Sequence, residues 1–149
     1  MLILPFLLKV GIIILLKAVV NTISIYKHKQ KEIDMPLMKM ETSAKVPAEK
    51  KEKLILSLSR ILADVTGKPE AYTMVTLAET TASMGGKLSS AAFADVRGIG
   101  GLNQKVNEGI SKQVADLLKA ELNIAPENIY LTFTEVATTN WGWKGGTFG

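Results

Sequence analysis

Hydrophobic and polar residues alternate from Leu37 to Thr42, with the period of two that is typical of a β-strand buried on one face. Beyond this run, apolar residues recur at intervals of three and four, which is typical of an amphipathic helix. The members of this stripe are Leu54, Ile55, Leu58, Ile61, Leu62 and Val65. Pro47 suits the first turn of such a helix, and Gly67 followed by Pro69 ends it.

The second half of the chain repeats this alternation of strand and helix. The pattern predicts strands near 72–79, 91–97 and 129–136, a loop over 80–90 and a helix over 103–122. The glycine-rich segment 98–101 is expected to form the tight turn between the third strand and the second helix.

The element order is therefore β-α-β written twice, and each helix is long enough for a crossover between parallel strands. We predict an α+β fold, a two-layer α/β sandwich in which a four-stranded sheet carries two helices on one face. The other face of the sheet is left open. Apolar and aromatic residues on that face would need covering, so an oligomer is expected.

The hydrophobic pattern also separates a leader, residues 1–35, from the domain, residues 36–149. Residues 2–16 are almost wholly apolar, with Lys9 as the only charge. Three interpretations stay open: upstream sequence wrongly joined to the gene, with Met35 as the true start, a signal anchor, or a cleaved signal peptide. A lysine within a membrane span costs about 2.5–3.5 kcal/mol, which weighs against the anchor. No A-x-A cleavage site follows, which weighs against the signal peptide.

Composition narrows the chemistry of the domain. Cysteine is absent, which excludes disulfides, thiol nucleophiles and cysteine zinc sites. The single histidine, His28, lies in the leader, so neither a histidine metal site nor a catalytic triad is expected. Most of the net charge of +4 also belongs to the leader. The domain is nearly neutral, and nothing in its charge predicts nucleic-acid binding.

The pair Met35-Pro36 stands where the leader gives way to the domain. If translation begins at Met35 and this residue is removed, the nitrogen of Pro36 is a free secondary amine that can take up a proton. If Met1 begins the mature chain, the same nitrogen is an amide with no useful basicity. Partial burial and a nearby lysine would lower the pKa of a free prolyl amine, which suits it to abstract a proton beside a carbonyl group.

Six short motifs follow one another across residues 36–149. They are Pro36 at a strand start, Thr66-Gly67-Lys68-Pro69, Gly85-Gly86, Ile99-Gly100-Gly101, Ile129-Tyr130 and Gly142-Trp143-x-x-x-Thr147-Phe148. In this order and spacing they resemble the macrophage migration inhibitory factor family of the tautomerase superfamily. The resemblance covers essentially the whole domain and excludes the leader.

The resemblance implies a homotrimer whose active sites lie between subunits and need no metal or organic cofactor. It makes Pro36 the acid and base of keto–enol tautomerisation, Lys68 the cation that holds a substrate carboxylate, and Ile99 a backbone N–H contact. Tyr130 would come from the neighbouring subunit. Thr132 takes a position where animal members often have asparagine. The CxxC motif of the animal cytokines is missing, so no thiol-redox activity is implied.

We therefore expect a tautomerase that acts on small 2-oxo acids or aromatic carboxylates of the phenylpyruvate or dopachrome type. The alternative is a cytokine-like protein that keeps the fold and binds a receptor with little catalysis. Contact with a membrane is expected only if the leader is retained. A cytoplasmic location is expected, with secretion by a non-classical route or membrane anchoring as alternatives.

Each of these residues also has a purely structural interpretation. Pro36 suits the start of an edge strand, Lys68 the end of a helix, and Tyr130 the packing of a strand. Three aromatic residues of the tail are expected to pack at a subunit interface rather than to contact substrate: Trp141, Trp143 and Phe148.

Overall fold

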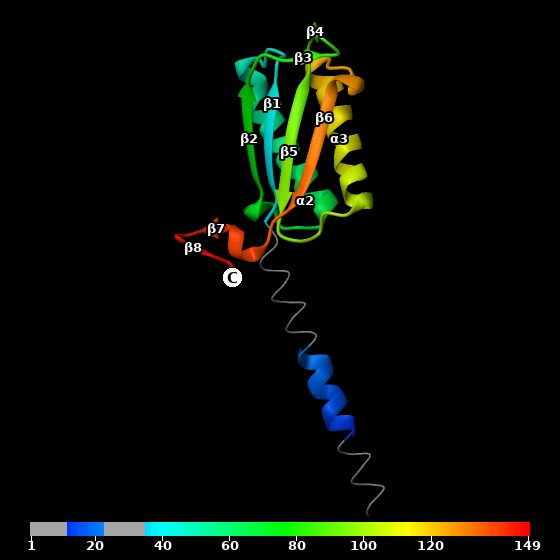
Figure 1. The fold of residues 1–149 in the computed structure, drawn as a ribbon, viewed down its shortest axis with the longest axis vertical. Coiled ribbons are helices and arrows are strands. Elements are labelled where there is room, and N and C mark those ends of the chain that lie inside the picture. The colour runs from blue at the N-terminus through cyan, green and yellow to red at the C-terminus, as the bar shows by residue number, and fades with distance from the viewer. Residues whose placement is uncertain (1–11, 23–34) are drawn as a thin grey trace, which may run out of the picture. The chain divides into compact units, whose positions relative to one another are not determined.

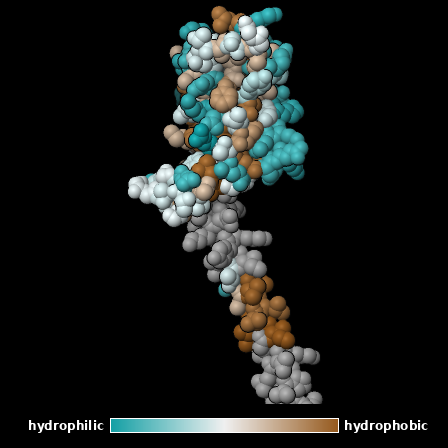
Figure 2. Space-filling model, viewed as in Figure 1, coloured by the Kyte–Doolittle hydropathy of each residue, from teal (hydrophilic) through white to brown (hydrophobic). Residues whose placement is uncertain are grey.

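The computed structural model describes residues 12–22 and 35–149. The chain divides into two compact units, Met1–Ile33 and Asp34–Gly149. In the first unit, residues 12–22 form a helix with exposed apolar side chains, drawn brown in Figure 2. No helix within the described ranges is long and apolar enough to cross a membrane. The expectations for residues 1–11 and 23–34, including His28, lie outside the described residues.

The second unit is built on a four-stranded sheet with the order β2-β1-β5-β6. Its strands are β1 (Leu37–Thr42), β2 (Met74–Glu79), β5 (Ala92–Gly98) and β6 (Ile129–Glu135). β1 is parallel to β2, β5 is parallel to β6, and the two pairs meet through the antiparallel neighbours β1 and β5 (Figure 1). The predicted fold class and duplication are confirmed, since each parallel pair is joined by a helix.

Two helices, α2 (Ala48–Thr66) and α3 (Gln104–Leu122), pack on one face of the sheet. Their ends follow from single residues. Gly67 stops α2 in the left-handed conformation at φ 69°, and the side chain of Asn103 caps α3 by accepting from the backbone N–H of Val106. The core lies between helices and sheet, and its largest fully buried members are Met38, Met40, Leu54, Leu58, Leu62, Val96, Ile110, Val114, Leu118 and Ile124.

Short elements in the connections differ from the prediction. The expected loop over 80–90 contains a small hairpin of β3 (Ser83–Met84) and β4 (Lys87–Leu88), and the tail contains another of β7 (Gly142–Trp143) and β8 (Gly146–Thr147). Strands of two residues are too short to show a period. Single 3-10 turns precede β2, β6 and β7: η1 (Glu70–Tyr72), η2 (Pro126–Asn128) and η3 (Thr138–Asn140). The second strand therefore begins at Met74 rather than at Tyr72.

The face of the sheet opposite the helices carries charge at its centre. Lys39 pairs with Glu41 at 2.7 Å, and Arg97 pairs with Asp95 at 2.7 Å. Hydrophilic and hydrophobic residues are interspersed over this face in Figure 2. The large apolar side chains expected on the open face are confined to its two ends, where they are Leu37, Met74, Phe93 and Tyr130.

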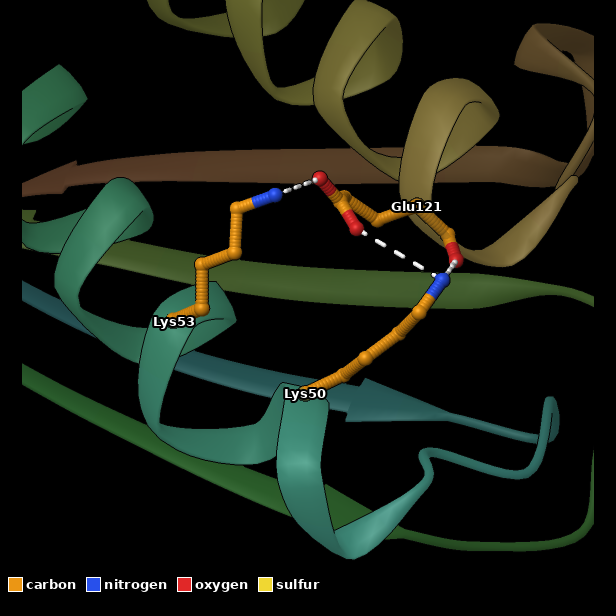
Figure 3. A network of polar contacts seen from close by, with 3 residues as sticks. All are labelled: Lys50, Lys53 and Glu121. Carbon is orange, nitrogen blue, oxygen red and sulfur yellow. Dashed lines mark hydrogen bonds and ion pairs between the residues drawn. The ribbon is translucent and has the colours of Figure 1, made fainter.

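The two helices are also joined by a polar contact far from the sheet's open face. Lys50 and Lys53 of α2 both reach Glu121 at the end of α3 (Figure 3). The ammonium of Lys53 lies 2.7 Å from one carboxylate oxygen, and that of Lys50 donates to the backbone carbonyl of Glu121 at 3.1 Å. Hydrogen bonding from Lys53 lowers the pKa of the Glu121 carboxyl.

Candidate active site

The register of the sheet brings four chain segments to one end of it. Leu37 lies opposite both Met74 and Arg97, so β1 and β2 begin where β5 and β6 end. Pro36, just before β1, accepts a hydrogen bond of 3.1 Å from the backbone N–H of Met74. The chain leaves β6 at this same end, where the N–H of Val136 donates to the carbonyl of Gly98 at 2.8 Å.

A pocket of about 540 Å³ opens at this end of the sheet. Pro36 and Met35 lie in its wall, and both side chains are buried. The other lining residues are Leu37, Ala71, Tyr72, Thr73, Met74, Arg97, Val136, Asn140, Trp141, Gly142 and Trp143. We call this cavity the Pro36 pocket. The predicted base therefore borders a space large enough for a small aromatic acid.

One wall of the Pro36 pocket is aromatic. The ring of Tyr72 meets the ring of Trp143 edge-on at 6.1 Å, and Trp143 stacks on Phe148 at 5.7 Å. The ammonium of Lys144 lies 4.2 Å from the centre of the Trp143 ring. Trp143 and Phe148 therefore pack on one another within one chain, and their expected place at a subunit interface, like that of Trp141, stays a prediction. Tyr72 was missed as a site residue, although it ends the turn that leads into the strand bonded to Pro36.

Lys68 lies beside the turn that follows β5 rather than in the pocket wall. Its side chain is only 8% exposed, and its ammonium donates to the carbonyl oxygens of Ile99 at 3.1 Å and Gly100 at 2.6 Å. The structure thus brings the two predicted residues Lys68 and Ile99 together. Neither is among the described residues that line the Pro36 pocket. Their roles in binding substrate stay predictions.

Tyr130 and Thr132 lie elsewhere on the sheet. Tyr130 pairs with Phe93 near the start of β5, at the opposite end from Pro36, and its side chain is 64% exposed. It borders a separate hollow of about 200 Å³. Thr132 pairs with Asp95 in the middle of the open face. One chain alone does not bring either residue to Pro36, and the predicted contribution from a neighbouring subunit stays a prediction.

Arg97 is a pocket residue that sequence reasoning missed. It is the last charged residue of β5, lies opposite Leu37, and is the only charged side chain among the described residues that line the Pro36 pocket. Its Nε and one terminal nitrogen both approach Oδ2 of Asp95, at 2.9 and 2.7 Å. This hydrogen bonding raises the pKa of the Arg97 guanidinium, which is therefore a permanent cation.

The pocket wall also holds an unsatisfied polar atom. The hydroxyl of Thr73 is buried and makes no hydrogen bond with any described residue. Metal ligation has no comparable support, because the described ranges contain no cluster of three or more acidic or histidine side chains placed to hold an ion. The arrangement offers an aromatic wall, one cation and a prolyl nitrogen, which is a set suited to an aromatic anion.

Comparison with known proteins gives concordant results. The model of the macrophage migration inhibitory factor (MIF) family matches residues 35–149. The macrophage migration inhibitory factor of Rattus norvegicus is 30% identical over 118 residues, which cover 76% of this chain and 99% of the rat protein.

Solved structures agree with this similarity. A macrophage migration inhibitory factor-like protein from Entamoeba histolytica has a TM-score of 0.74 and 36% identity, and a homologue from Prochlorococcus marinus has a TM-score of 0.72 and 31% identity. Each alignment covers 76% of this chain and 99% of the other. Domains equivalent to residues 36–149 therefore form nearly the whole of these relatives.

Proposed function

Because this chain belongs to the macrophage migration inhibitory factor family, we propose that it is a tautomerase whose acid and base is the free amine of Pro36. Its substrates are small aromatic 2-oxo acids or carboxylates of the phenylpyruvate or dopachrome type. The observation that carries the proposal is the position of Pro36. It borders a pocket with an aromatic wall, and the residue before it is a methionine, whose removal from a chain begun at Met35 would free the prolyl nitrogen.

In the proposed reaction, the neutral amine of Pro36 takes a proton from C3 of the 2-oxo acid. The electron pair of the broken C3–H bond forms the C2=C3 double bond, and the carbonyl pair moves onto oxygen. The protonated amine then delivers its proton to that oxygen, which converts ketone to enol and returns the amine to its neutral form. The step balances without an oxidant, a reductant or an external acid.

Burial of Pro36 supports the role of a base near neutral pH. An amine that loses water on burial becomes harder to protonate, so its pKa falls from the range of ordinary amines. Lys68 lies close to the same end of the sheet and would lower it further through charge repulsion. The enolate oxygen needs hydrogen-bond donors, for which the N–H of Ile99 and the hydroxyl of Tyr130 from a neighbouring subunit are the proposed groups.

The experiment compares the chain 36–149, with Pro36 as its first residue, with Pro36→Ala in the same chain. We expect the substitution to remove most phenylpyruvate tautomerisation, because the secondary amine is lost. The chain 1–149 is the matched control, since it keeps the proline side chain but has an amide nitrogen. The mechanism is wrong if Pro36→Ala is as active as the unsubstituted chain 36–149, or if the chain 1–149 is as active as the chain 36–149.

Assembly as a homotrimer is part of the same proposal. It is supported by the open sheet face and by the distance along the sheet between Tyr130 and Pro36, which one chain does not bridge. Light scattering after size-exclusion chromatography measures the molar mass directly. A monomeric mass with full activity would show that Tyr130 takes no part in the site.

A further inference from the structure

We propose that Arg97 is the residue that binds the carboxylate of the aromatic acid in the Pro36 pocket. This inference deepens the proposed function, because it names the cation that selects an acid at that site. It differs from the expectation that Lys68 alone supplies the positive charge. Four observations lead to it.

The first observation is the position of Arg97. Its neighbour across the sheet is Leu37, the residue directly after Pro36. The Arg97 side chain lines the same cavity as Pro36, Tyr72 and Trp143. A carboxylate bound by Arg97 therefore lies in the cavity that holds both the predicted base and the aromatic wall.

The second observation is the remaining donor capacity of Arg97. A guanidinium group has five N–H donors. Two nitrogens of Arg97 donate to a single oxygen of Asp95, at 2.9 and 2.7 Å. These bonds occupy two of the donors, and no other bond of this side chain occurs within the described residues. The other terminal nitrogen keeps its two hydrogens for a second carboxylate, and the side chain is 53% exposed.

The third observation concerns Asp95. Its side chain is only 18% exposed, and it is fixed on the same strand two residues before Arg97. Its hydrogen bonds hold the plane of the guanidinium before any ligand arrives. An arginine that is already ordered loses less side-chain entropy when it binds an anion. Asp95 is in this sense a positioning residue and not a ligand.

The fourth observation is the environment of Lys68. Its ammonium already donates to two backbone carbonyls, and its side chain is buried. Turning it toward a substrate would leave both carbonyls short of a donor in a poorly hydrated place. Arg97 binds an anion without giving up any bond that it already makes. Lys68 then contributes charge near the site, while Arg97 makes the direct contact.

The test is a binding measurement that does not depend on turnover. Both tryptophans of the chain, Trp141 and Trp143, line the pocket, so their fluorescence reports a ligand there. The protein is the chain 36–149, which lies within one compact unit and corresponds to nearly the whole length of the rat relative. The probes are 3-phenylpropanoate and its neutral amide, which share a ring and differ in charge.

We expect Arg97→Ala to weaken binding of the acid about tenfold or more, because a hydrogen-bonded charge pair is lost, and to leave binding of the amide almost unchanged. Arg97→Lys should bind the acid with an affinity between those of the wild type and Arg97→Ala, because a lysine keeps the charge but not the planar fork. Arg60→Ala is the matched control. Arg60 is the only other arginine, it is exposed on α2, and its loss should change neither affinity.

Two results overturn the inference: equal loss of acid and amide binding in Arg97→Ala, or acid binding that survives at wild-type strength. If Arg97→Ala does not fold by circular dichroism, Arg97→Gln keeps a polar side chain without the charge, although a shorter one, and takes its place. Turnover is measured separately with phenylpyruvate, for which we expect Arg97→Ala to raise KM about tenfold with a smaller change in kcat.

The two proposals fail in different ways. If the acid binds through Arg97 but no variant, wild type included, turns over phenylpyruvate, the tautomerase proposal fails and the binding site stands. If turnover depends on Pro36 but binding of the acid does not depend on Arg97, the binding inference fails and the tautomerase proposal stands. If the wild type binds the acid no better than the amide, the pocket does not select a carboxylate and the inference is wrong.

Discussion

Lys68 donates a hydrogen bond of 3.1 Å to the carbonyl oxygen of Ile99, which lies 31 residues later in the chain. This bond ties the end of α2 to the turn that leaves β5. The turn follows closely after Arg97, which pairs with Leu37, the residue directly after Pro36. The geometry of the candidate site therefore depends on how this turn is held.

Gly101 is the residue against which Lys68 packs, and this gives the first prediction. Gly101 has φ 84°, and a Cβ atom there would lie 3.1 Å from both Cε and Nζ of Lys68. We expect Gly101→Ala to destabilise the domain by about 1–2 kcal/mol through backbone strain, and to cost more because Lys68 must shift. Chemical denaturation measures the difference.

Gly145→Ala is the matched control for this change. Gly145 has nearly the same conformation, φ 81°, but a Cβ atom there would meet nothing within 4 Å. Both variants carry the backbone strain, and only Gly101→Ala disturbs Lys68. Equal destabilisation of the two would show that the Lys68 side chain makes room for the added Cβ atom without a cost in stability.

Two threonine hydroxyls, one of the buried Thr42 and one of the half-buried Thr73, provide the second prediction. The hydroxyl of Thr42 donates to the carbonyl of Ala91 at 3.0 Å and accepts from the N–H of Ala44 at 3.1 Å, whereas that of Thr73 has no described partner. Thr42→Val should cost about 1–3 kcal/mol, because it leaves the backbone N–H of Ala44 without its acceptor, whereas the Ala91 carbonyl still accepts from the N–H of Ser43. Thr73→Val should cost almost nothing in stability, since no hydrogen bond is lost.

The same pair separates stability from activity. Thr73 lines the Pro36 pocket and Thr42 does not, within the part of the chain that the structure describes. A fall in kcat/KM for phenylpyruvate in Thr73→Val, with unchanged stability, would show that this hydroxyl serves the ligand. A loss of stability equal to that of Thr42→Val would contradict the expected difference between them.

The third prediction concerns pH. Hydrogen bonding from Lys53 lowers the pKa of Glu121 in the folded state, so folding favours the ionised carboxylate. The resulting stabilisation is present above the pKa of the unfolded chain and is lost as the pH falls through the lower folded value. Glu121→Gln should therefore lower Tm at pH 7, and the difference from the wild type should shrink between about pH 5 and pH 3.

Glu127→Gln serves as the control for this pH series. Glu127 lies on η2, is exposed, and forms no ion pair with any other described residue. Its substitution should leave Tm close to the wild-type value at every pH. A Tm difference for Glu121→Gln that is constant with pH would show that its pairing with Lys50 and Lys53 does not depend on the carboxylate charge.

The fourth prediction tests whether the site is shared between subunits. Pro36→Ala keeps Tyr130, and Tyr130→Ala keeps Pro36, so if the proposed trimer shares its sites between subunits, a mixed trimer rebuilds complete sites at some interfaces. Equal amounts of the two inactive variants, unfolded and refolded together, should recover about a quarter of the wild-type activity, as random assembly of a closed ring predicts.

Mixing Pro36→Ala with Tyr72→Ala is the control. Both residues line the same pocket of one chain, so no mixed trimer contains a site with both intact. The activity of this mixture should equal the mean of the activities of the two variants measured separately. Recovery that is no larger with Tyr130→Ala than with Tyr72→Ala would place Tyr130 outside the site.

Local sequence was sufficient for the large elements of this protein. The alternation in β1 and β6 and the spacing of three and four in α2 and α3 follow from backbone geometry, because each period places one face toward the core. Gly67 ended its helix as expected, since glycine tolerates a positive φ. The order of short motifs was likewise enough to indicate the family.

Tertiary structure alone decided which side chains meet. Tyr72, Arg97 and Trp143 gather around Pro36 because strand register and the returning tail bring their segments to one end of the sheet. No local period encodes that register. The Lys68 side chain bonds to a carbonyl that only the fold places beside it. The centre of the open face carries ion pairs within β1 and within β5, where apolar residues were expected. Contacts between residues far apart in sequence depend on packing and hydrogen bonding in three dimensions, which is why the sequence pattern predicted the elements but not the composition of the pocket.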